Sequence, residues 1–349
     1  METERENKMF KSVKIEDAIG LFIAHDITEI RKGEFKGRAF KKGHRIHPRD
    51  ICHFQRIGKR HVYTLDIKEG YVHENDAAIA MVQAFCGPGV SWHGEPKEGK
   101  LNLYAERDGL LKIDVTALTQ INMLGEVMCA ARHTNTLVKE GDIVAATRAI
   151  PLVLKREVVQ EAVDIAGNRD GIAMVKPLRK AKTGIVITGN EVFTRLIEDH
   201  FEPILRKKID RIGSEVIDVA FSPDDPLTIA DKIKKLLSIG ADLILTTGGM
   251  SVDPDDVTRK GIQMTGGETE CYGAPILPGA MFLISYIDEV PILGVPACGL
   301  YHKITILDLI LPRILAGEKI ERIHIAEMGH GGLCLNCPEC RFPNCPFGK

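Results

Sequence analysis

The sequence predicts an α/β protein in which a doubly wound, mostly parallel sheet follows smaller β-rich domains. From about residue 177, short apolar runs that end in glycine alternate with amphipathic helical segments, as in βαβ units. Before that point, short strand patterns separated by turn residues dominate the chain. The length of 349 residues also exceeds a single ordinary core and fits two or three domains.

The N-terminal half is expected to form two β-rich accessory domains, over residues 1–84 and 85–176. Residues 31–60 carry eleven Lys and Arg side chains against two acidic ones, a local charge of +9. Glycines and a proline within this basic segment favour short strands and turns over a helix. The segment is either an anion-contacting surface or the solvated face of a small β module.

Further local patterns lie within the same half of the chain. Residues 73–85 predict a helix for which Asn75 or Asp76 is the N-cap. Residues 101–115 alternate around Asp108-Gly109, which predicts a β-hairpin. A second strand, turn and strand pattern surrounds the turn at residues 140–142. The basic segment at 175–182 then links these domains to the α/β region.

The α/β domain is expected over residues 177–320, and its elements alternate regularly. Asp225 is a favourable N-cap for a helix whose first residue is Pro226, and Gly213 is a favourable end for the helix before it. The predicted elements are, in order, a strand at 184–189, a helix at 203–213, a strand at 215–221, a helix at 226–240, a strand at 242–249, a helix near 255–263 and, after two more strands, a helix at 301–315.

Three strand ends of this domain combine glycines with hydroxyl or acidic side chains. They read TGNE at 188–191, TTGGMSVDPDD at 246–256 and GVPACG at 294–299. Ligands of open α/β sheets bind at the carboxyl ends of strands, and glycines let backbone amides approach an anion. Carboxylates beside them predict Mg²⁺ bridging the protein and a phosphorylated ligand, although such acids also serve as caps. The acids of this rim are Glu191, Asp224, Asp225, Asp253, Asp255 and Asp256.

Familiar phosphate-binding and hydrolytic motifs are missing from the sequence. There is no GxxxxGK[ST], and no GxGxxG follows a strand, which excludes the P-loop and the usual dinucleotide-binding turn. HExxH and GxSxG are also absent, which excludes a zinc protease and a hydrolase nucleophile elbow.

Taken together, the strand ends resemble the molybdopterin-binding domain of molybdenum cofactor biosynthesis proteins. That domain occurs in molybdopterin molybdenumtransferases and Mog-type adenylyltransferases, and TGNE, SPDDP and TTGGMSVDPDD stand here in the family's order between about 182 and 318. The resemblance implies that Glu191, Asp225 and Asp256 hold a metal or assist transfer. It implies that the pterin or its phosphate is held by Thr188, Gly189, Asn190, Thr247, Gly248, Gly249, Met250, Ser251, Pro296 and Gly299.

Two positions depart from the transferase branch of this family. Asn190 stands where that branch has an acid in TGDE, and GVPACG stands in place of GLPGNP. Two functions therefore stay open: transfer of a metal or an adenylyl group to molybdopterin with Mg²⁺, or non-catalytic binding by a carrier or sensor whose cysteine knuckle docks a partner. Cys298, in the altered loop, is either a buried structural thiol or a thiol near a soft metal.

Residues 329–349 contain four of the nine cysteines. Four closely spaced thiols without an apolar core around them predict a metal knuckle in a reduced compartment. The spacing resembles the bacterial iron–sulfur pattern C-x₂-C-x₂-C-x₃-C-P with one extra residue before the last cysteine, and tetrahedral Zn²⁺ fits equally. The predicted ligands are Cys334, Cys337, Cys340 and Cys345.

Composition narrows the expected partners and location. The formal charge of −2 argues against a nucleic-acid partner, although the basic segment and the knuckle keep that alternative open. No run approaches the ~18 apolar residues of a membrane span, and the N-terminus has no apolar signal region, so a cytoplasmic protein without membrane contact is expected. The resemblance implies molybdopterin or its adenylylated form as ligand, a homo-oligomer, and a molybdoenzyme or another protein of the molybdenum or tungsten cofactor pathway as partner.

Overall fold

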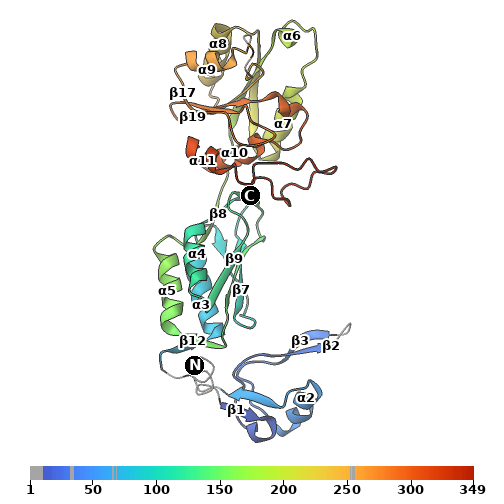
Figure 1. Cartoon of the computed structure of the whole chain (residues 1–349), viewed down its shortest axis with the longest axis vertical. Helices are drawn as coiled ribbons and strands as arrows, with labels where there is room; N and C mark the ends of the chain where they lie inside the picture. The colour runs from blue at the N-terminus through green and yellow to red at the C-terminus, as the bar shows by residue number, and fades with distance from the viewer. Residues whose placement is uncertain (1–10, 32–34, 65–66, 68, 252, 254–255) are drawn as a thin grey trace. The chain divides into compact units, whose positions relative to one another are not determined.

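The computed structural model describes residues 11–31, 35–64, 67, 69–251, 253 and 256–349. The chain divides into two compact units, and Figure 1 labels many of their elements. Unit 1 comprises 1–107, 113–132 and 139–175, and unit 2 comprises 108–112, 133–138 and 176–349. The division into four domains that the sequence predicts stays a prediction.

The N-terminal part of unit 1 is a small β-rich module with its own core. Strand β1 pairs antiparallel with β4, and β2 pairs antiparallel with β3. The rings of Phe40 and Phe54 stack with centroids 4.0 Å apart, and Phe54 is fully buried among aliphatic side chains. The elements are β1 (Lys11–Lys14), η1 (Ile15–Ala18), β2 (Ile27–Arg31), β3 (Phe35–Phe40), η2 (Pro48–Asp50), α2 (Ile51–Arg56) and β4 (His61–Thr64).

The rest of unit 1 packs helices against an antiparallel sheet of order β6-β7-β11-β9, and β12 pairs with β5. Helix α3 contacts α5 and β11. The elements are β5 (Tyr71–His73), α3 (Glu74–Phe85), β6 (Val90–Ser91), β7 (Lys100–Ala105), α4 (Val115–Met123), β9 (Val127–Ala131), β11 (Ile143–Ala149), β12 (Val153–Lys155), α5 (Arg156–Gly167) and β13 (Ala173–Lys176).

The start of α3 differs from the prediction. His73, and neither Asn75 nor Asp76, is the N-cap, because its ring Nδ1 accepts the Asn75 backbone N–H at 3.1 Å. The other ring nitrogen, Nε2, lies 2.5 Å from the Ala24 carbonyl oxygen. One nitrogen therefore accepts and the other donates, which is the pattern of a neutral imidazole. His73 is 1% exposed and links the helix start to the N-terminal module.

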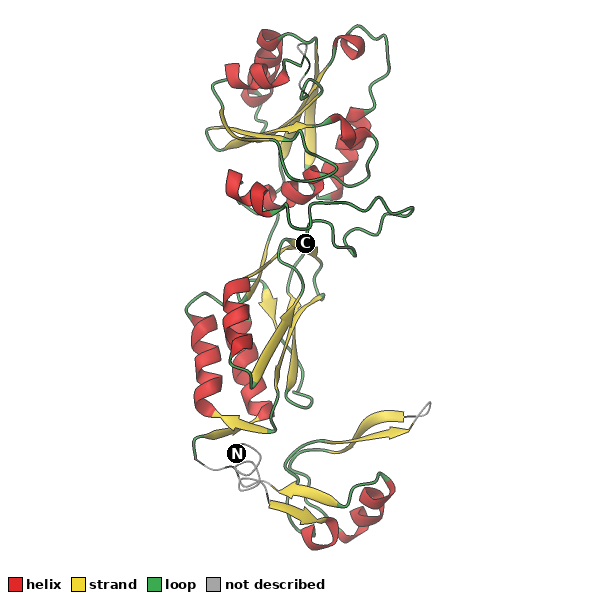
Figure 2. Cartoon of the chain, in the orientation of Figure 1, coloured by secondary structure: helices red, strands yellow, loops and turns green. Residues whose placement is uncertain are grey.

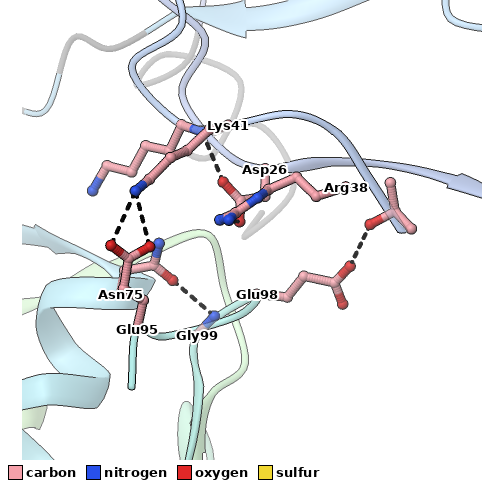
Figure 3. Close-up of polar contacts among 9 residues, drawn as sticks. Asp26, Arg38, Lys41, Asn75, Glu95, Glu98 and Gly99 are labelled. Carbon is pink, nitrogen blue, oxygen red and sulfur yellow. Dashed lines mark hydrogen bonds and ion pairs between the residues drawn. The ribbon is translucent and has the colours of Figure 1, made fainter. Parts of the chain in front are cut away.

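Part of the positive charge of the basic segment is paired within unit 1 (Figure 3). Arg38 Nη1 lies 2.9 Å from the carboxylate of Asp26, which also accepts the backbone N–H of Lys42 at 2.7 Å. Lys41 Nζ lies 2.9 Å from the carboxylate of Glu95. These contacts favour the interpretation of the basic segment as a solvated face, because acidic side chains of the protein itself already pair with these cations. Residues 32–34 of the segment lie outside the described residues.

The predicted hairpin at Asp108-Gly109 is wrong in its pairing. Strand β7 pairs with β6 and β11, whereas β8 (Gly109–Ile113) pairs antiparallel with β10 (Thr136–Val138) in unit 2. Lys112 Nζ lies 2.6 Å from the Asn135 side-chain oxygen and 2.6 Å from the Glu318 carboxylate. Burial alone would raise the pKa of Glu318, but Lys112 and Arg313 outweigh it and lower that pKa. These contacts attach the two short segments 108–112 and 133–138 to the rest of unit 2.

Unit 2 confirms the predicted doubly wound α/β fold. Its six-stranded sheet has the order β15-β14-β16-β19-β18-β17. The first four strands are parallel, β18 pairs antiparallel with β19, and β17 pairs antiparallel with β18. The strands are β14 (Lys182–Thr188), β15 (Glu215–Ser222), β16 (Leu243–Thr247), β17 (Glu268–Tyr272), β18 (Leu283–Ile287) and β19 (Val290–Val295). The helices are α6 (Asn190–Phe193), α7 (Phe201–Arg211), α8 (Pro226–Ser238), α9 (Thr258–Met264), η3 (Ala297–Leu300), α10 (Ile306–Leu315) and α11 (Arg322–Glu327).

Alternate side chains of the central strands fill two separate buried clusters. Ile185 and Ile187 of β14 pack with residues of α7 and α10, whereas Val186 between them packs with residues of α8 and α9. Because successive side chains of a strand point to opposite faces, helices cover both faces of the sheet. No helix among the described residues has the length and apolar character that a bilayer crossing requires.

The segment after α11 is loop and is drawn green in Figure 2. Leu277 donates its N–H to Gly332 O, and Cys334 donates its N–H to Leu277 O, both at 2.8 Å. At the other end Phe347 is 3% exposed within the core of unit 2, and the Gly348 N–H bonds to Gly331 O at 3.0 Å. The segment is therefore a loop closed at its base and anchored on unit 2.

Candidate functional site

A cavity of about 600 Å³ opens at the carboxyl ends of β16 and β19, and we call it the strand-end cavity. One wall is the loop 248–251, and residues 296–298 that follow β19 form a second wall. Asp256 and the segment 277–281 also line it. Parallel strands end at one edge of the sheet, so two of the three predicted strand ends meet around the same space.

The loop that follows β16 runs close against its neighbours, and glycine is required there. Gly248 has φ +78°, and a Cβ at this position would lie 2.5 Å from the Thr188 carbonyl oxygen. Gly249 has φ +53°, and a Cβ there would lie 2.5 Å from Thr258 Oγ1. Consecutive residues with positive φ and no side chain leave their backbone amides accessible, which suits a bound anion.

Thr188, Thr247 and Thr258 form a buried group beneath this loop. Thr188 Oγ1 donates to Thr247 O at 2.7 Å and lies 2.9 Å from Thr258 Oγ1. Thr188 and Thr247 were predicted to contact a ligand, but all three residues are buried and none lines the strand-end cavity. Their position supports the glycine loop, and the ligand contact of Thr188 and Thr247 stays a prediction.

Tyr272 of β17 supports the same loop, a role for which the sequence carries no local sign. Its hydroxyl donates to Met250 O at 2.7 Å, and the Arg259 guanidinium lies 3.6 Å from the centre of its ring. Met250 is 3% exposed and fits against Gly294 of β19, where a Cβ would overlap its side chain. The hydroxyl of Tyr272 therefore fixes the carbonyl at the centre of the loop.

We expect Tyr272→Phe to loosen the loop without unfolding the domain. Loss of one hydrogen bond costs about 1 kcal/mol, which corresponds to roughly fivefold faster amide exchange in residues 248–251. Hydrogen–deuterium exchange with mass spectrometry measures this change. Tyr286→Phe is the matched control, because Tyr286 of β18 accepts the Ile320 N–H at 2.9 Å and does not line the cavity. Equal exchange of the loop in both variants would contradict the supporting role.

The described acidic residues of the predicted rim do not gather at one place. Asp256 lines the strand-end cavity, where its Oδ2 accepts the Asp253 N–H at 3.2 Å. Asp225 instead caps α8, since its carboxylate accepts the N–H and the hydroxyl of Thr228 at 2.8 and 2.6 Å. These hydrogen bonds hold the pKa of Asp225 below its usual value. Asp255 lies outside the described residues.

The TGNE strand end joins its neighbour on β15 and does not line the cavity. The Asn190 N–H donates to the Asp224 carboxylate at 2.8 Å, and Asn190 Oδ1 accepts the Asp224 N–H at 3.1 Å. Either Asn or Asp could supply the accepting oxygen, so the departure from TGDE preserves this link. The carboxylate of Glu191 lies over Gly189, where a Cβ would be 3.1 Å from Oε1. Glu191 itself is exposed.

The third strand end contributes Pro296 and Cys298 to the strand-end cavity. Burial raises the pKa of the Cys298 thiol, so the protonated form is favoured. Gly299 lines a neighbouring cavity of about 250 Å³ with Lys207, Lys208 and Arg211 of α7. His302, which sequence reasoning did not select, lines both cavities.

The predicted metal ligands do not form a ready-made site. Among the described residues, no three His, Cys, Asp or Glu side chains gather as a metal ion would require. Cys334 and Cys345 are half-buried, Cys337 and Cys340 are exposed, and all four are free thiols. Cys334 also lines the strand-end cavity. The metal knuckle stays a prediction, and its ligand residues are considered further below.

A family model described as "Probable molybdopterin binding domain" matches residues 184–316. The matched residues extend from β14 to α10 and include all three strand ends, so this part of unit 2 matches the molybdopterin-binding domain family. A second model, described as "Domain of unknown function (DUF8806)", matches residues 12–66, which is the N-terminal module of unit 1.

Individual proteins and structures are similar to parts of the chain. A CinA-like protein of Mycobacterium sp. (strain MCS) is 35% identical over 78 residues, 22% of this chain and 18% of that protein. The chain thus aligns with about a fifth of this relative's length. The MoaB molybdopterin biosynthesis enzyme of Thermus thermophilus is 20% identical over 40% of this chain and 98% of its own, with a TM-score of 0.33. The MoeA protein of Pyrococcus horikoshii is 16% identical over 89% of this chain and 76% of its own, with a TM-score of 0.32.

Proposed function

We propose that the strand-end cavity binds molybdopterin and that the protein acts in molybdenum or tungsten cofactor biosynthesis. One observation carries this proposal: the loop 248–251, the residues 296–298 and Asp256 line a single cavity within the segment that the molybdopterin-binding family model matches. A cavity of about 600 Å³ has the size of sites that hold a ligand of this class.

The lining supplies chemistry that suits a phosphorylated pterin. Gly248 and Gly249 line the cavity in a loop held by Tyr272, and their backbone amides would bind the terminal phosphate. Apolar groups of Leu277, Pro278 and Met281 line the cavity and offer contact to the ring system. Asp256 would hold Mg²⁺, which binds proteins through one or two carboxylates and completes its coordination with phosphate and water.

Anaerobic titration of the purified protein with molybdopterin tests the binding function. We expect saturable binding of one molybdopterin per chain, and fluorescent pterin released by oxidation of protein purified from the cell. A folded protein that shows neither would contradict the proposal.

Transfer of a metal or an adenylyl group to molybdopterin is a second candidate, which the carboxylate of Asp256 in the cavity favours. In that case Asp256→Asn is expected to lower turnover by about 100-fold or more and to change molybdopterin affinity by less than about threefold. Turnover of molybdopterin with ATP or molybdate, measured beside binding, checks this expectation.

Asp225→Asn is the matched comparison, since asparagine also caps helices and Asp225 is engaged at the start of α8. We expect this variant to keep its turnover. Equal loss in both variants would contradict the assignment of Asp225 as a cap. Molybdopterin binding without turnover in the unchanged protein would contradict transfer and leave the carrier or sensor function.

A further inference from the structure

The C-terminal loop places all four of its cysteines around one space. A cavity of about 580 Å³, which we call the tail cavity, is lined by Cys334, Cys337, Cys340 and Cys345 together with His302. Cys334 and Cys345 stand near the two anchored ends of the loop and pack against the core of unit 2. Cys337 and Cys340 lie between them on its exposed part. Two of the four cysteines are therefore fixed by packing, and the other two lie on the exposed part of the same loop.

The surroundings of the tail cavity suit bound thiolates. The cationic side chains of Lys303 and Arg341 also line it. Four thiolates around a divalent metal ion carry a net charge of −2, which these cations offset. Closure would require a shift of the exposed part of the loop, because no three ligand side chains among the described residues gather at present.

We propose that these four cysteines bind one thiophilic metal centre and that this centre sets the affinity of the strand-end cavity. Each bound thiolate releases its thiol proton to solvent as the metal–sulfur bond forms, with no change of oxidation state for Zn²⁺. The coupling rests on the proposed molybdopterin-binding function, whereas the metal site itself does not.

The two cavities share a wall, which gives the coupling a physical basis. Leu333, Cys334, Asn336 and His302 line both of them. Leu277 forms backbone hydrogen bonds with Gly332 and Cys334. Leu277 also lines the strand-end cavity. A metal that draws the loop together at Cys334 therefore fixes part of the wall that a ligand contacts. By thermodynamic reciprocity, bound molybdopterin would tighten the metal by the same factor.

The metal site is tested first with Co²⁺ on the full-length, chelator-treated protein. We expect one Co²⁺ per chain, with the strong near-ultraviolet absorption of thiolate coordination and displacement by Zn²⁺. Cys337→Ser and Cys340→Ser should lose this spectrum, and Cys52→Ser, which changes an exposed cysteine of α2, should keep it. Anaerobic purification with iron and sulfide analysis distinguishes a cluster from a single ion. Absence of thiolate-bound metal under both conditions would overturn the proposal.

The coupling is tested by titrating molybdopterin into metal-loaded and chelator-treated protein. We expect at least about a fivefold difference in affinity, which Cys337→Ser abolishes and Cys52→Ser retains. Cys337 does not line the strand-end cavity, so the variant keeps all ligand contacts. Equal affinity with and without metal would overturn the coupling and leave the binding function intact. Metal binding in a protein with no molybdopterin affinity would instead contradict the proposed function and, with it, the coupling.

Discussion

Replacement of Gly248 by alanine is expected to abolish most of the molybdopterin affinity. The residue has φ +78°, which costs an alanine roughly 1–2 kcal/mol. Its Cβ would also lie 2.5 Å from Thr188 O and 2.7 Å from Thr188 Oγ1, and overpacking of this kind costs about 1–3 kcal/mol. The loop must move away from β14 to relieve the overlap, so its amides leave the positions from which they would bind phosphate.

We therefore expect Gly248→Ala to weaken molybdopterin binding at least about tenfold and to destabilise unit 2 by about 3 kcal/mol. Isothermal titration and hydrogen exchange of unit 2 measure the two effects. Gly266→Ala is the control, because Gly266 has φ +90° and a Cβ there would meet nothing within 4 Å. It shares the backbone strain without the overlap. Unchanged affinity in Gly248→Ala would show that the loop does not bind the ligand.

Replacement of Glu74 by glutamine is expected to change how the stability of unit 1 depends on pH. Glu74 is 7% exposed at the start of α3, and burial raises its pKa to about 7 from an ordinary 4.5. The folded state therefore binds the proton more tightly than the unfolded state. The stability that this provides is complete below pH 4.5 and is lost as the pH rises to about 7, at a total of about 3 kcal/mol.

His73, the preceding residue, has the opposite effect on stability. Burial lowers its pKa to about 4 from an ordinary 6.5, so the unfolded state binds the proton more tightly. Its contribution is complete above pH 6.5 and is lost as the pH falls toward 4. Between pH 4.5 and 6.5 the two slopes oppose each other, and their sum is expected to be nearly flat.

Glu74→Gln removes one slope and leaves the other. Unit 1 of this variant should gain about 3 kcal/mol between pH 4 and 6.5, and at pH 8 it should exceed the unchanged protein by a similar amount. Trp92 is the single tryptophan of the chain and lies in unit 1, so its fluorescence during urea unfolding reports this unit. Glu157→Gln, at an exposed site in the first turn of α5, is the control. A flat profile in Glu74→Gln would contradict the assignment.

The sequence predicted the α/β fold well because its signals are local. Apolar runs mark β14 and β16, glycines end them, and Asp225 with Pro226 marks the start of α8. The predicted pairing of β7 with β8 was wrong, because Asp108-Gly109 favours a turn but does not determine which strands the flanking residues pair with. Partner choice depends on contacts distant in the sequence, such as those of β8 with β10.

The candidate site was predictable to a similar extent. The loop 248–251 and Asp256 share the strand-end cavity, and a glycine pair after a strand indicates such a place. Tyr272 and His302 could not be selected, because only tertiary packing brings a residue of β17 to the loop and places His302 between two cavities. The proximity of Cys334 to the same space likewise depends on the anchoring of the tail at Leu277.

Two short segments of unit 2, residues 108–112 and 133–138, precede its main segment and lie between segments of unit 1. A recombination event that moved residues 176–349 as one block of gene would leave Lys112 and Asn135 behind. Glu318 would then keep Arg313 at 2.8 Å but lose Lys112, so one of the two cations that lower the pKa of this half-buried carboxylate would be missing. Unit 2 therefore cannot be transferred whole as one contiguous block of gene.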